Sequence, residues 1–332
     1  MNILADLIAL GIFAAKAIIV ALVIIFILFM FFMLLAKGKE KAKAHLSIKN
    51  LNDKYEEVVE EISHATCNKK QLKKFYKEKK AAKKAAENLP CSNVFVIDFV
   101  GDMKASTVTN LTEEVNAVIS AATSADEVLV KIDSGGGLVH TYGLAAAQLM
   151  RIRAKNIPLT VAIDKVAASG GYLMACVANK ILAAPFAIIG SIGVIVQLPN
   201  FHRVLKEKKI DFEMHTAGDF KRTITVFGEN TPEGREKLQE EIEDIHGLFK
   251  NQIQLHRPQV DIAKVATGEH WMGQQALGLK LVDEIKTADE YLLEKSKTAK
   301  IIEISYHIRK PMLSKLTSAA GMLFDKLRLM IM

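Results

Sequence analysis

A serine followed by two glycines, Ser169-Gly170-Gly171, stands between a strand-like run and an alanine-rich segment. A hydroxyl on such a sharp strand-to-helix turn is exposed, and the N–H groups of the first helical turn face the place where an oxyanion would form. The two glycines let the backbone of a substrate approach closely. The turn therefore offers the chemistry of a nucleophile, although a serine that only caps the helix would give the same pattern.

A serine hydroxyl is a weak nucleophile, so the turn needs a partner that takes up its proton. Lys221 follows a strand-like run and a glycine turn, and a lysine acts as a base once burial lowers its pKa from about 10.4 to roughly 7–8. Such a shift costs about 4 kcal/mol and requires a dry amine, whereas spacing alone fits a solvated lysine equally well. The histidines of the globular part stand beside no telling motif and fit surface or core positions: His140, His202, His215, His246 and His270.

Strand-like and helix-like runs alternate from residue 92 onwards. This alternation predicts an α/β domain with crossover connections and largely parallel strands, and the nearly continuous apolar character of the strands predicts a sheet covered on both faces. Farther along, Thr231 and the proline after it predict the start of a long helix. The predicted strands are residues 94–99, 127–132, 158–163 and 180–184, with residues 212–216 extended; the predicted helices are residues 110–122, 138–154, 172–179, 201–208 and 231–256.

Residues 17–36 form an uncharged, apolar run of twenty residues. At about 1.5 Å per residue a helix of this length covers roughly the 30 Å hydrocarbon core of a bilayer. Because no obvious cleavage site follows, we expect an uncleaved transmembrane anchor, with a buried core helix as the alternative. The lysines at residues 37–43 would place the bulk of the chain in the cytoplasm by the positive-inside rule.

The net charge of +7 comes largely from one segment, because nine of the lysines lie within residues 68–86. Without them the chain is close to neutral, so its pI of 9.1 does not argue for a nucleic-acid-binding protein. The lysine spacing predicts a helix with a broad cationic face, which fits either an anionic lipid surface or a solvated linker helix. Cys67, Cys91 and Cys176 lack metal-ligand spacing, and a pairing of the first two stays open.

Several motifs taken together resemble the signal peptide peptidase A family of serine–lysine peptidases, peptidase family S49. Two positions depart from the family pattern: Gly135 stands where proline is common, and Lys280 stands where glycine is usual. We expect a more flexible loop at the first and only a structural effect at the second. The resemblance covers about residues 90–290 and is carried by Ser169-Gly170-Gly171-Tyr172, Ala175, Gly190-Ser191-Ile192-Gly193-Val194, Gly218 with Lys221, and a later group, Trp271, Gly273, Gln274, Ala276, Val282 and Asp283.

The resemblance implies a role for each motif residue. Ser169 would be the nucleophile that forms the acyl-enzyme, Lys221 the general base, and Ser191 the residue that holds the lysine amine by a hydrogen bond. The N–H of Gly170 would form one side of the oxyanion hole, and preorganised donors of this kind are worth about 3–4 kcal/mol each. The other side would come from the glycine loop after residue 133: Gly136 or Gly137. The family implies no cofactor and no metal.

The family fold resembles the crotonase and caseinolytic-protease type, a spiral of mainly parallel strands with flanking helices that assembles into rings. This implies a homo-oligomer with the site near a subunit interface, and hydrolysis of peptides in or near the membrane, such as signal-peptide remnants. Two other functions stay open: a non-proteolytic crotonase-like acyl-binding protein, and a membrane scaffold without catalysis.

The chain is thus predicted to have four parts. Residues 1–40 are the membrane anchor, residues 41–90 a charged helical stalk, residues 91–295 the serine peptidase α/β domain, and residues 296–332 a C-terminal extension with an amphipathic helix. We expect the protein in a bacterial inner membrane. The side of the catalytic domain stays open, because the family is often drawn with it on the outer face.

Overall fold

The computed structural model describes residues 3–36, 44–86 and 92–308. The chain divides into two units: residues 1–45 together with 307–332, and residues 46–306. The second unit holds both sheets and every predicted site residue, so it is the part that positions the site. The lysines of residues 37–43, Cys91 and the predicted amphipathic C-terminal helix lie outside the described residues.

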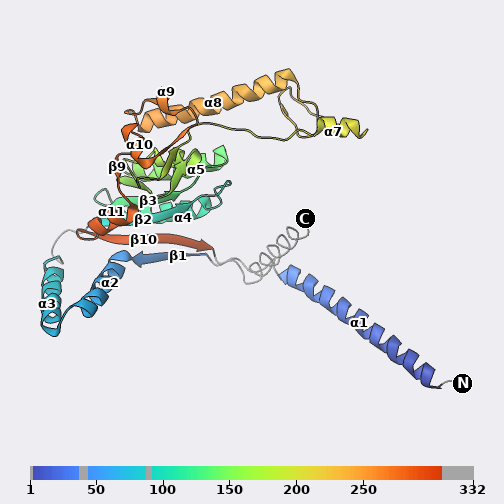
Figure 1. Ribbon diagram of the computed structural model, residues 1–332, viewed down its shortest axis with the longest axis horizontal. Helices are drawn as coiled ribbons and strands as arrows, with labels where there is room; N and C mark the ends of the chain where they lie inside the picture. Colours follow the sequence, from blue (N-terminus) through green and yellow to red (C-terminus); the bar gives the residue numbers. More distant parts are fainter. Residues whose placement is uncertain (1–2, 37–43, 87–91, 309–332) are drawn as a thin grey trace. The chain divides into compact units, whose positions relative to one another are not determined.

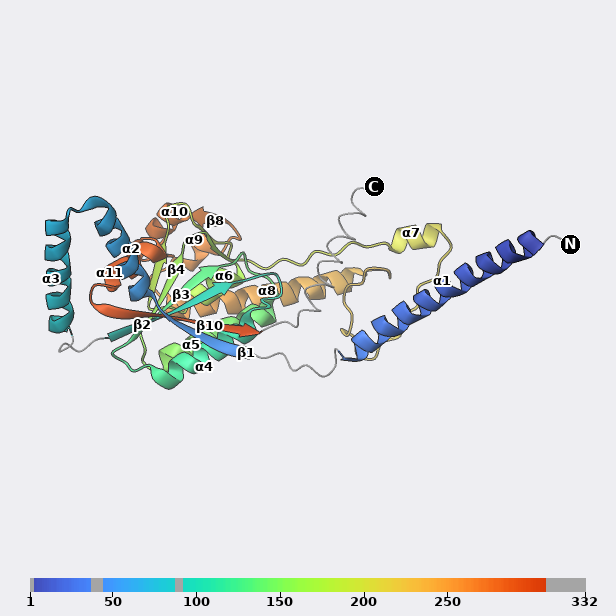
Figure 2. The same cartoon turned by 90° about the horizontal axis from the view of Figure 1, so that it is seen from below.

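A seven-stranded sheet forms the centre of the second unit, with the strand order β1-β10-β2-β3-β4-β6-β9 (Figures 1 and 2). The pairs β10–β2, β2–β3, β3–β4, β4–β6 and β6–β9 are all parallel, as predicted from the alternating runs. Its strands are β1 (Ala44–Asn50), β2 (Ser92–Val100), β3 (Glu127–Asp133), β4 (Leu159–Ile163), β6 (Lys180–Ala183), β9 (Glu284–Ile285) and β10 (Ala299–Ile308).

Helices cover both faces of this sheet, which is why its strands are apolar almost throughout. On β2, Ile97 and Phe99 belong to the cluster with α4 (Val108–Ala121) and α5 (Val139–Ala154). Val94 and Val96 point to the other face and join the cluster with α11 (Ala288–Lys295). Successive residues of one strand thus fill two separate cores.

A smaller three-stranded sheet, ordered β5-β7-β8, carries the predicted nucleophile. Strands β5 (Val166–Ala168) and β7 (Ile188–Gly190) are parallel, whereas β8 (His270–Met272) is antiparallel to β7. Helix α6 (Gly170–Ala175) starts directly after β5, and α10 (Gly273–Gly278) starts directly after β8. The remaining helices of this half are α7 (His202–Glu207), α8 (Pro232–His256) and α9 (Ile262–Val265).

The predicted strands and helices between residues 92 and 184 are confirmed, and α8 begins as predicted with the Thr231 side chain accepting a hydrogen bond from the N–H of Gly234. Residues 172–179 are helical only as far as Ala175, and residues 212–216 form no strand. Residues 44–50, expected to be helical, form β1 instead, because they pair with β10. β10 itself lacks a sequence prediction and lies between β1 and β2.

Between β1 and β2 the chain forms two helices, α2 (Leu51–Thr66) and α3 (Lys69–Ala86), which lie side by side (Figures 1 and 2). Asn52 ties the start of α2 to the start of β10, because its side chain donates to the carbonyls of Ser296 and Ala299 and accepts from the N–H of Ile301. The charged segment before residue 90 is therefore fastened to the sheet at its first helical turn.

Residues 3–36 form one helix, α1 (Ile3–Ala36), whose described apolar side chains are solvent-exposed, such as Phe13 and Phe26. Within the part of the chain that the structure describes, no helix is both long and apolar enough to cross a membrane, so the predicted transmembrane helix is not found there.

Candidate active site

Ser169 occupies the single residue between β5 and α6. Its backbone angles, φ 51° and ψ −119°, lie where residues other than glycine are rarely found, and such strain gathers at functional sites. Its N–H donates to the carbonyl of Gly190 at 2.8 Å, which holds the turn in place. The Ser169 side chain makes no capping hydrogen bond, so the helix-cap interpretation is wrong and the hydroxyl is left available.

Ser191 follows β7 in the same way that Ser169 follows β5. Ala168 and Gly190 are paired in the register of the two parallel strands, so the serine after each lies at the same edge of the sheet. Ser191 also has a positive φ, 48°. Its hydroxyl donates to the carbonyl of Gly268 at 3.4 Å, a long bond that leaves the group free to turn to another partner.

The glycine loop after β3 lies against the Ser169 turn. Ser134 pairs with β5, donating to the carbonyl of Val166 and accepting from the N–H of Ala168. Gly136 has a φ of +87°, and a Cβ atom there would lie 2.6 Å from the Gly170 nitrogen and 2.9 Å from the Ser169 Cβ. Only glycine therefore fits at this position.

Of the two N–H groups in this loop that could bind an oxyanion, one is free of other hydrogen bonds. The N–H of Gly136 donates to the Ser134 hydroxyl at 3.1 Å, so it is already engaged. Among the described residues, the N–H groups of Gly137 and Gly170 make no hydrogen bond, and both residues line the same cavity as Ser169. Of the predicted pair, Gly137 is thus the better placed partner of Gly170.

Tyr142, which sequence reasoning missed, supports both sides of this arrangement. It is fully buried, and its ring fills the space where a Cβ on Gly170 would lie, 2.5 Å from the nearest ring carbon. Its hydroxyl donates to the carbonyl of Asp102 at 2.7 Å and therefore accepts from the Ser134 hydroxyl at 2.5 Å. Burial raises the pKa of Tyr142, so the hydroxyl keeps its proton. The only signal in the sequence was an aromatic hydroxyl in the first turn of the helix after the glycine loop.

A cavity of about 330 Å³ opens beside Ser169. Apart from Ser169 and the two glycines it is lined mainly by apolar side chains, so it suits an extended or apolar ligand group. These side chains come from α5, α6, α8 and the segment after β7: Val139, Tyr142, Ala146, Met150, Leu173, Val194, Ile195, Ile245, Leu248 and Phe249.

Lys221 is not among the residues that line this cavity. It is exposed, and it belongs to residues 194–231, a segment called the arm below, which projects with α7 away from the sheet in both views (Figures 1 and 2). The neighbouring Phe220 ring lies 5.3 Å from the Lys237 Nζ near the start of α8. Phe249, which lines the cavity, follows twelve residues later, about 18 Å along the helix. Within one copy of the chain the structure therefore brings Ser169, Ser191 and the glycines together but not Lys221, and the dyad stays a prediction.

The arm carries an unusual number of exposed large apolar side chains. Soluble surfaces seldom expose such a set without a partner. The ring centroids of Phe201 and Phe212 lie 6.2 and 5.9 Å from that of Phe227, so the three rings form an aromatic cluster that stays exposed. The exposed residues are Ile195, Val196, Leu198, Phe201, Val204, Ile210, Phe212, Met214, Phe220 and Phe227.

The later motif group holds the small sheet against the rest of the domain. A Cβ atom on Gly190 would lie 2.7 Å from the Trp271 ring, and a Cβ atom on Gly273 would lie 2.1 Å from the Ala184 carbonyl oxygen. Asp283 accepts two hydrogen bonds of 2.7 Å from the buried Arg257 guanidinium, and it also accepts from the Ile181 N–H. Trp271 therefore packs against β7, whereas Asp283 anchors β6, and none of these residues lines the cavity beside Ser169.

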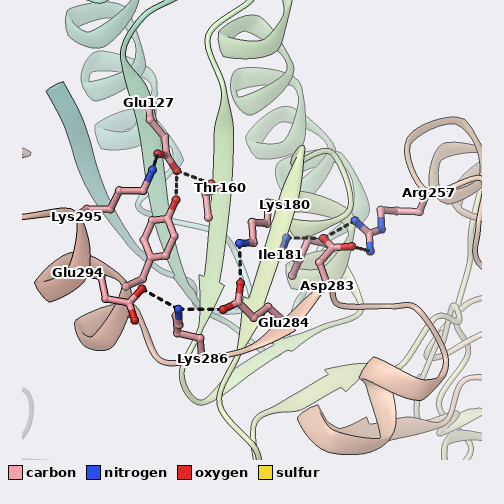
Figure 3. Close-up of polar contacts among 11 residues, drawn as sticks. Glu127, Thr160, Lys180, Ile181, Arg257, Asp283, Glu284, Lys286, Glu294 and Lys295 are labelled. Atoms are coloured by element: carbon pink, nitrogen blue, oxygen red, sulfur yellow. Dashed lines mark hydrogen bonds and ion pairs between the residues drawn. The ribbon is translucent and has the colours of Figure 1, made fainter. Parts of the chain in front are cut away.

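A second polar cluster lies at the start of β3 and fixes α11 to the sheet (Figure 3). The Glu127 carboxylate accepts from the Thr160 and Tyr291 hydroxyls and pairs with the Lys295 ammonium at 2.7 Å. Lys286 similarly bridges Glu284 and Glu294. None of these groups lines the cavity beside Ser169, so their role is structural.

Comparison with known proteins shows the family of this chain. The family model described as "Peptidase family S49" matches residues 151–302, and "Peptidase family S49 N-terminal" matches residues 5–149. "Probable protease SohB" of Haemophilus influenzae is 45% identical over 319 residues, covering 92% of this chain and 90% of the relative. "Probable protease SohB" of Buchnera aphidicola subsp. Schlechtendalia chinensis is 46% identical over 275 residues, covering 79% and 90%. A solved structure of a mutant of the 1510-N membrane-bound stomatin-specific protease aligns with a TM-score of 0.42 and 15% identity, covering 62% of this chain and 86% of that one.

The chain therefore belongs to peptidase family S49 and is a protease by family. Within the family it is of the SohB type. The resemblance inferred from the motif residues is confirmed, and the parallel α/β architecture that it implied is the one described above.

Proposed function

We propose that this protease is a membrane-anchored serine endopeptidase with Ser169 as nucleophile and Lys221 as general base, the lysine being supplied by a neighbouring copy of the chain. The observation that carries the proposal is the Ser169 turn, because its uncapped hydroxyl and two unengaged N–H groups share one cavity. The mainly parallel strands of the two sheets fit the predicted crotonase-like spiral.

The chemistry follows from the placement of these groups. As the Ser169 oxygen attacks the substrate carbonyl carbon, the Lys221 amine takes the hydroxyl proton, and the N–H groups of Gly170 and Gly137 hold the oxyanion. The lysine then gives the proton to the leaving amine as the C–N bond breaks. A water molecule hydrolyses the acyl-enzyme by the same steps, and the weakly held Ser191 hydroxyl turns to hold the lysine amine.

The shared site explains two features that one copy leaves unexplained. Lys221 is exposed in the single chain, where a charged amine would be a poor base, and contact with a second copy would bury it. The exposed apolar side chains of the arm supply a surface for that contact. We therefore propose a homo-oligomer in which each arm reaches the cavity of its neighbour.

Membrane attachment is the second part of the proposal. It rests on the uncharged run of residues 17–36 and on the exposed apolar side chains of α1, and it places the enzyme in a bacterial inner membrane. Substrates would be signal-peptide remnants or membrane-associated proteins whose apolar side chains suit the cavity. Protease protection in intact and broken spheroplasts tests on which side the catalytic domain lies.

Mixing two inactive variants tests the shared site. Ser169→Ala and Lys221→Ala are each expected to abolish hydrolysis of a peptide substrate without unfolding the protein. Co-expression of the two variants is expected to restore about a quarter of the wild-type activity, because random assembly pairs an intact serine with an intact lysine in roughly one interface of four. Full activity of either single variant would remove the dyad. No recovery on mixing would place both residues in one chain.

A further inference from the structure

The two opposite faces of helix α3 have different surroundings. Toward α2 it presents Phe75 and Lys79, both half-buried. The Lys79 ammonium reaches the carboxylates of Glu56 and Glu60 on α2 at 2.7 and 2.6 Å. The lysine on this face is thus neutralised by its own chain, and the face is occupied.

Four other lysines of α3 lie on the opposite side: Lys70, Lys73, Lys77 and Lys80. Their spacing of three, four and three residues places them in one row within an arc of about 80°, whereas Lys79 lies about 200° from Lys77. All four are exposed. Among the described residues, none of the four has an ion pair. We call this row the lysine stripe.

The stripe is costly for an isolated helix, because like charges three and four residues apart repel each other. The acidic groups of the hairpin lie mostly on the other helix, where Asp53, Glu57 and Glu61 are exposed, and Glu78 of α3 pairs with Lys74 beside the stripe. A partner for the stripe must therefore be anionic and must touch one face of α3 without enclosing α2. A flat anionic surface meets this condition, whereas a polyanion that wraps around the hairpin would meet the carboxylates of α2.

We propose that the lysine stripe docks α3 onto the anionic headgroups of the lipid bilayer, with α2 facing away from it. The attraction of each lysine to such a surface raises the binding constant about fivefold. A row along one helix lets several lysines act together. This inference rests on the membrane attachment proposed above and is independent of the peptidase chemistry. Its consequence is a second contact with the membrane, beyond the N-terminal helix.

Amine footprinting of the full chain in lipid nanodiscs tests the docking. Discs of phosphatidylcholine alone are compared with discs that contain about 30% phosphatidylglycerol. In the anionic discs we expect the stripe lysines to react at least about fivefold more slowly with an amine-acylating reagent, and we expect the protection to disappear at about 1 M NaCl. The exposed Lys155 and Lys264 are expected to react equally in both and serve as references.

A pair of matched variants separates the stripe from net charge. One variant changes the four stripe lysines to glutamine, and the control changes four exposed lysines elsewhere: Lys155, Lys264, Lys297 and Lys300. Glutamine forms helices about as well as lysine, so both variants should fold. In anionic discs, Lys69 and Lys74, which flank the stripe, are expected to lose protection in the first variant and to keep it in the control.

The outcomes distinguish this inference from the proposals before it. Incorporation into discs without lipid-dependent protection overturns the docking but leaves the anchor intact. Equal protection in neutral and anionic discs also overturns it, and assigns the stripe to an acidic protein surface such as the α2 of a second copy. A chain that enters neither kind of disc contradicts the membrane attachment, and the docking fails with it. Hydrolysis of a soluble peptide is expected to stay unchanged in both variants.

Discussion

Around Ser169, hydrogen bonds and close contacts come from the glycine loop, from β7 and from α5, whereas the arm around Lys221 is held mainly by contacts within itself. The Ser169 N–H is bonded to Gly190, and Gly136 and Tyr142 fill the space beside the turn. In the arm, the Phe201 N–H donates to the carbonyl of Val226, so both partners of this hydrogen bond belong to the arm. The proposed nucleophile is thus held in place within one chain, whereas the proposed base lies in a segment that is held mainly by its own contacts.

The largest effect is expected where the turn is most crowded. Gly136→Ala would push a methyl group into the Gly170 nitrogen and force a positive φ on alanine. We expect kcat to fall by about 10³-fold, the loss seen when an oxyanion donor is misplaced. Gly135→Ala is the matched control, because nothing lies within 4 Å of its Cβ position, and it should retain near-normal kcat. Equal activity of the two variants would contradict the rigid turn.

A charge placed on the arm tests the other half of the comparison. Ile210→Asp puts a carboxylate on an exposed apolar position and is expected to disrupt assembly and lower activity by about 10²-fold, because burial of an unpaired charge is costly. Sedimentation velocity and peptide hydrolysis measure both effects. Leu293→Asp, equally exposed but on α11, should leave both unchanged. An active, fully assembled Ile210→Asp protein would mean that the arm makes no such contact.

Removal of one hydroxyl from the support of the turn should have a smaller effect. In Tyr142→Phe the ring that faces Gly170 stays, but the bonds to Ser134 and Asp102 are lost. We expect kcat to fall about tenfold with KM nearly constant, as for lost positioning of groups that act in the transition state. Steady-state kinetics provide the test. A change confined to KM would instead assign Tyr142 to substrate binding.

The smallest effect on activity is expected at Glu114, which touches neither region. This α4 carboxyl accepts from the Tyr306 N–H of β10, and burial, with a smaller contribution from Asp98, raises its pKa from 4.5 to about 7. The folded protein therefore binds this proton more tightly than the unfolded chain does, so the stability that it contributes is full below pH 4.5 and is lost as pH rises through 7.

Glu114→Gln should keep the hydrogen bond and abolish this dependence. We expect the variant to be more stable than wild type by about 1–3 kcal/mol at pH 8 and equal to it near pH 4.5 or below, with unchanged activity. Urea unfolding of both proteins across this range measures the difference. A constant difference at every pH would show that folding does not raise the pKa of Glu114.

Apolar runs and glycine motifs can be recognised from residues that are close in the sequence. They predicted four strands of the large sheet and the turn at Ser169. The apolar runs of β2, β3, β4 and β6 were evident because each is buried on both faces, and Ser169 was marked by its glycines. Tyr142 escaped because its role depends on a hydrogen bond to Asp102, forty residues away. β1 and β10 escaped because each gains its structure from a partner distant in the chain, and within one copy Lys221 does not reach the cavity beside Ser169.

The place of β10 beside β2 has a consequence for biosynthesis. The two strands are parallel partners, yet Ala299 pairs with Ser92 across more than two hundred residues of intervening chain. Until β10 has left the ribosome, β2 presents an unpaired backbone edge, and the apolar side chains under α11 lack their cover. Completion of the sheet is therefore a late event in synthesis, and nascent chains that stall before residue 299 should depend on chaperones to stay soluble.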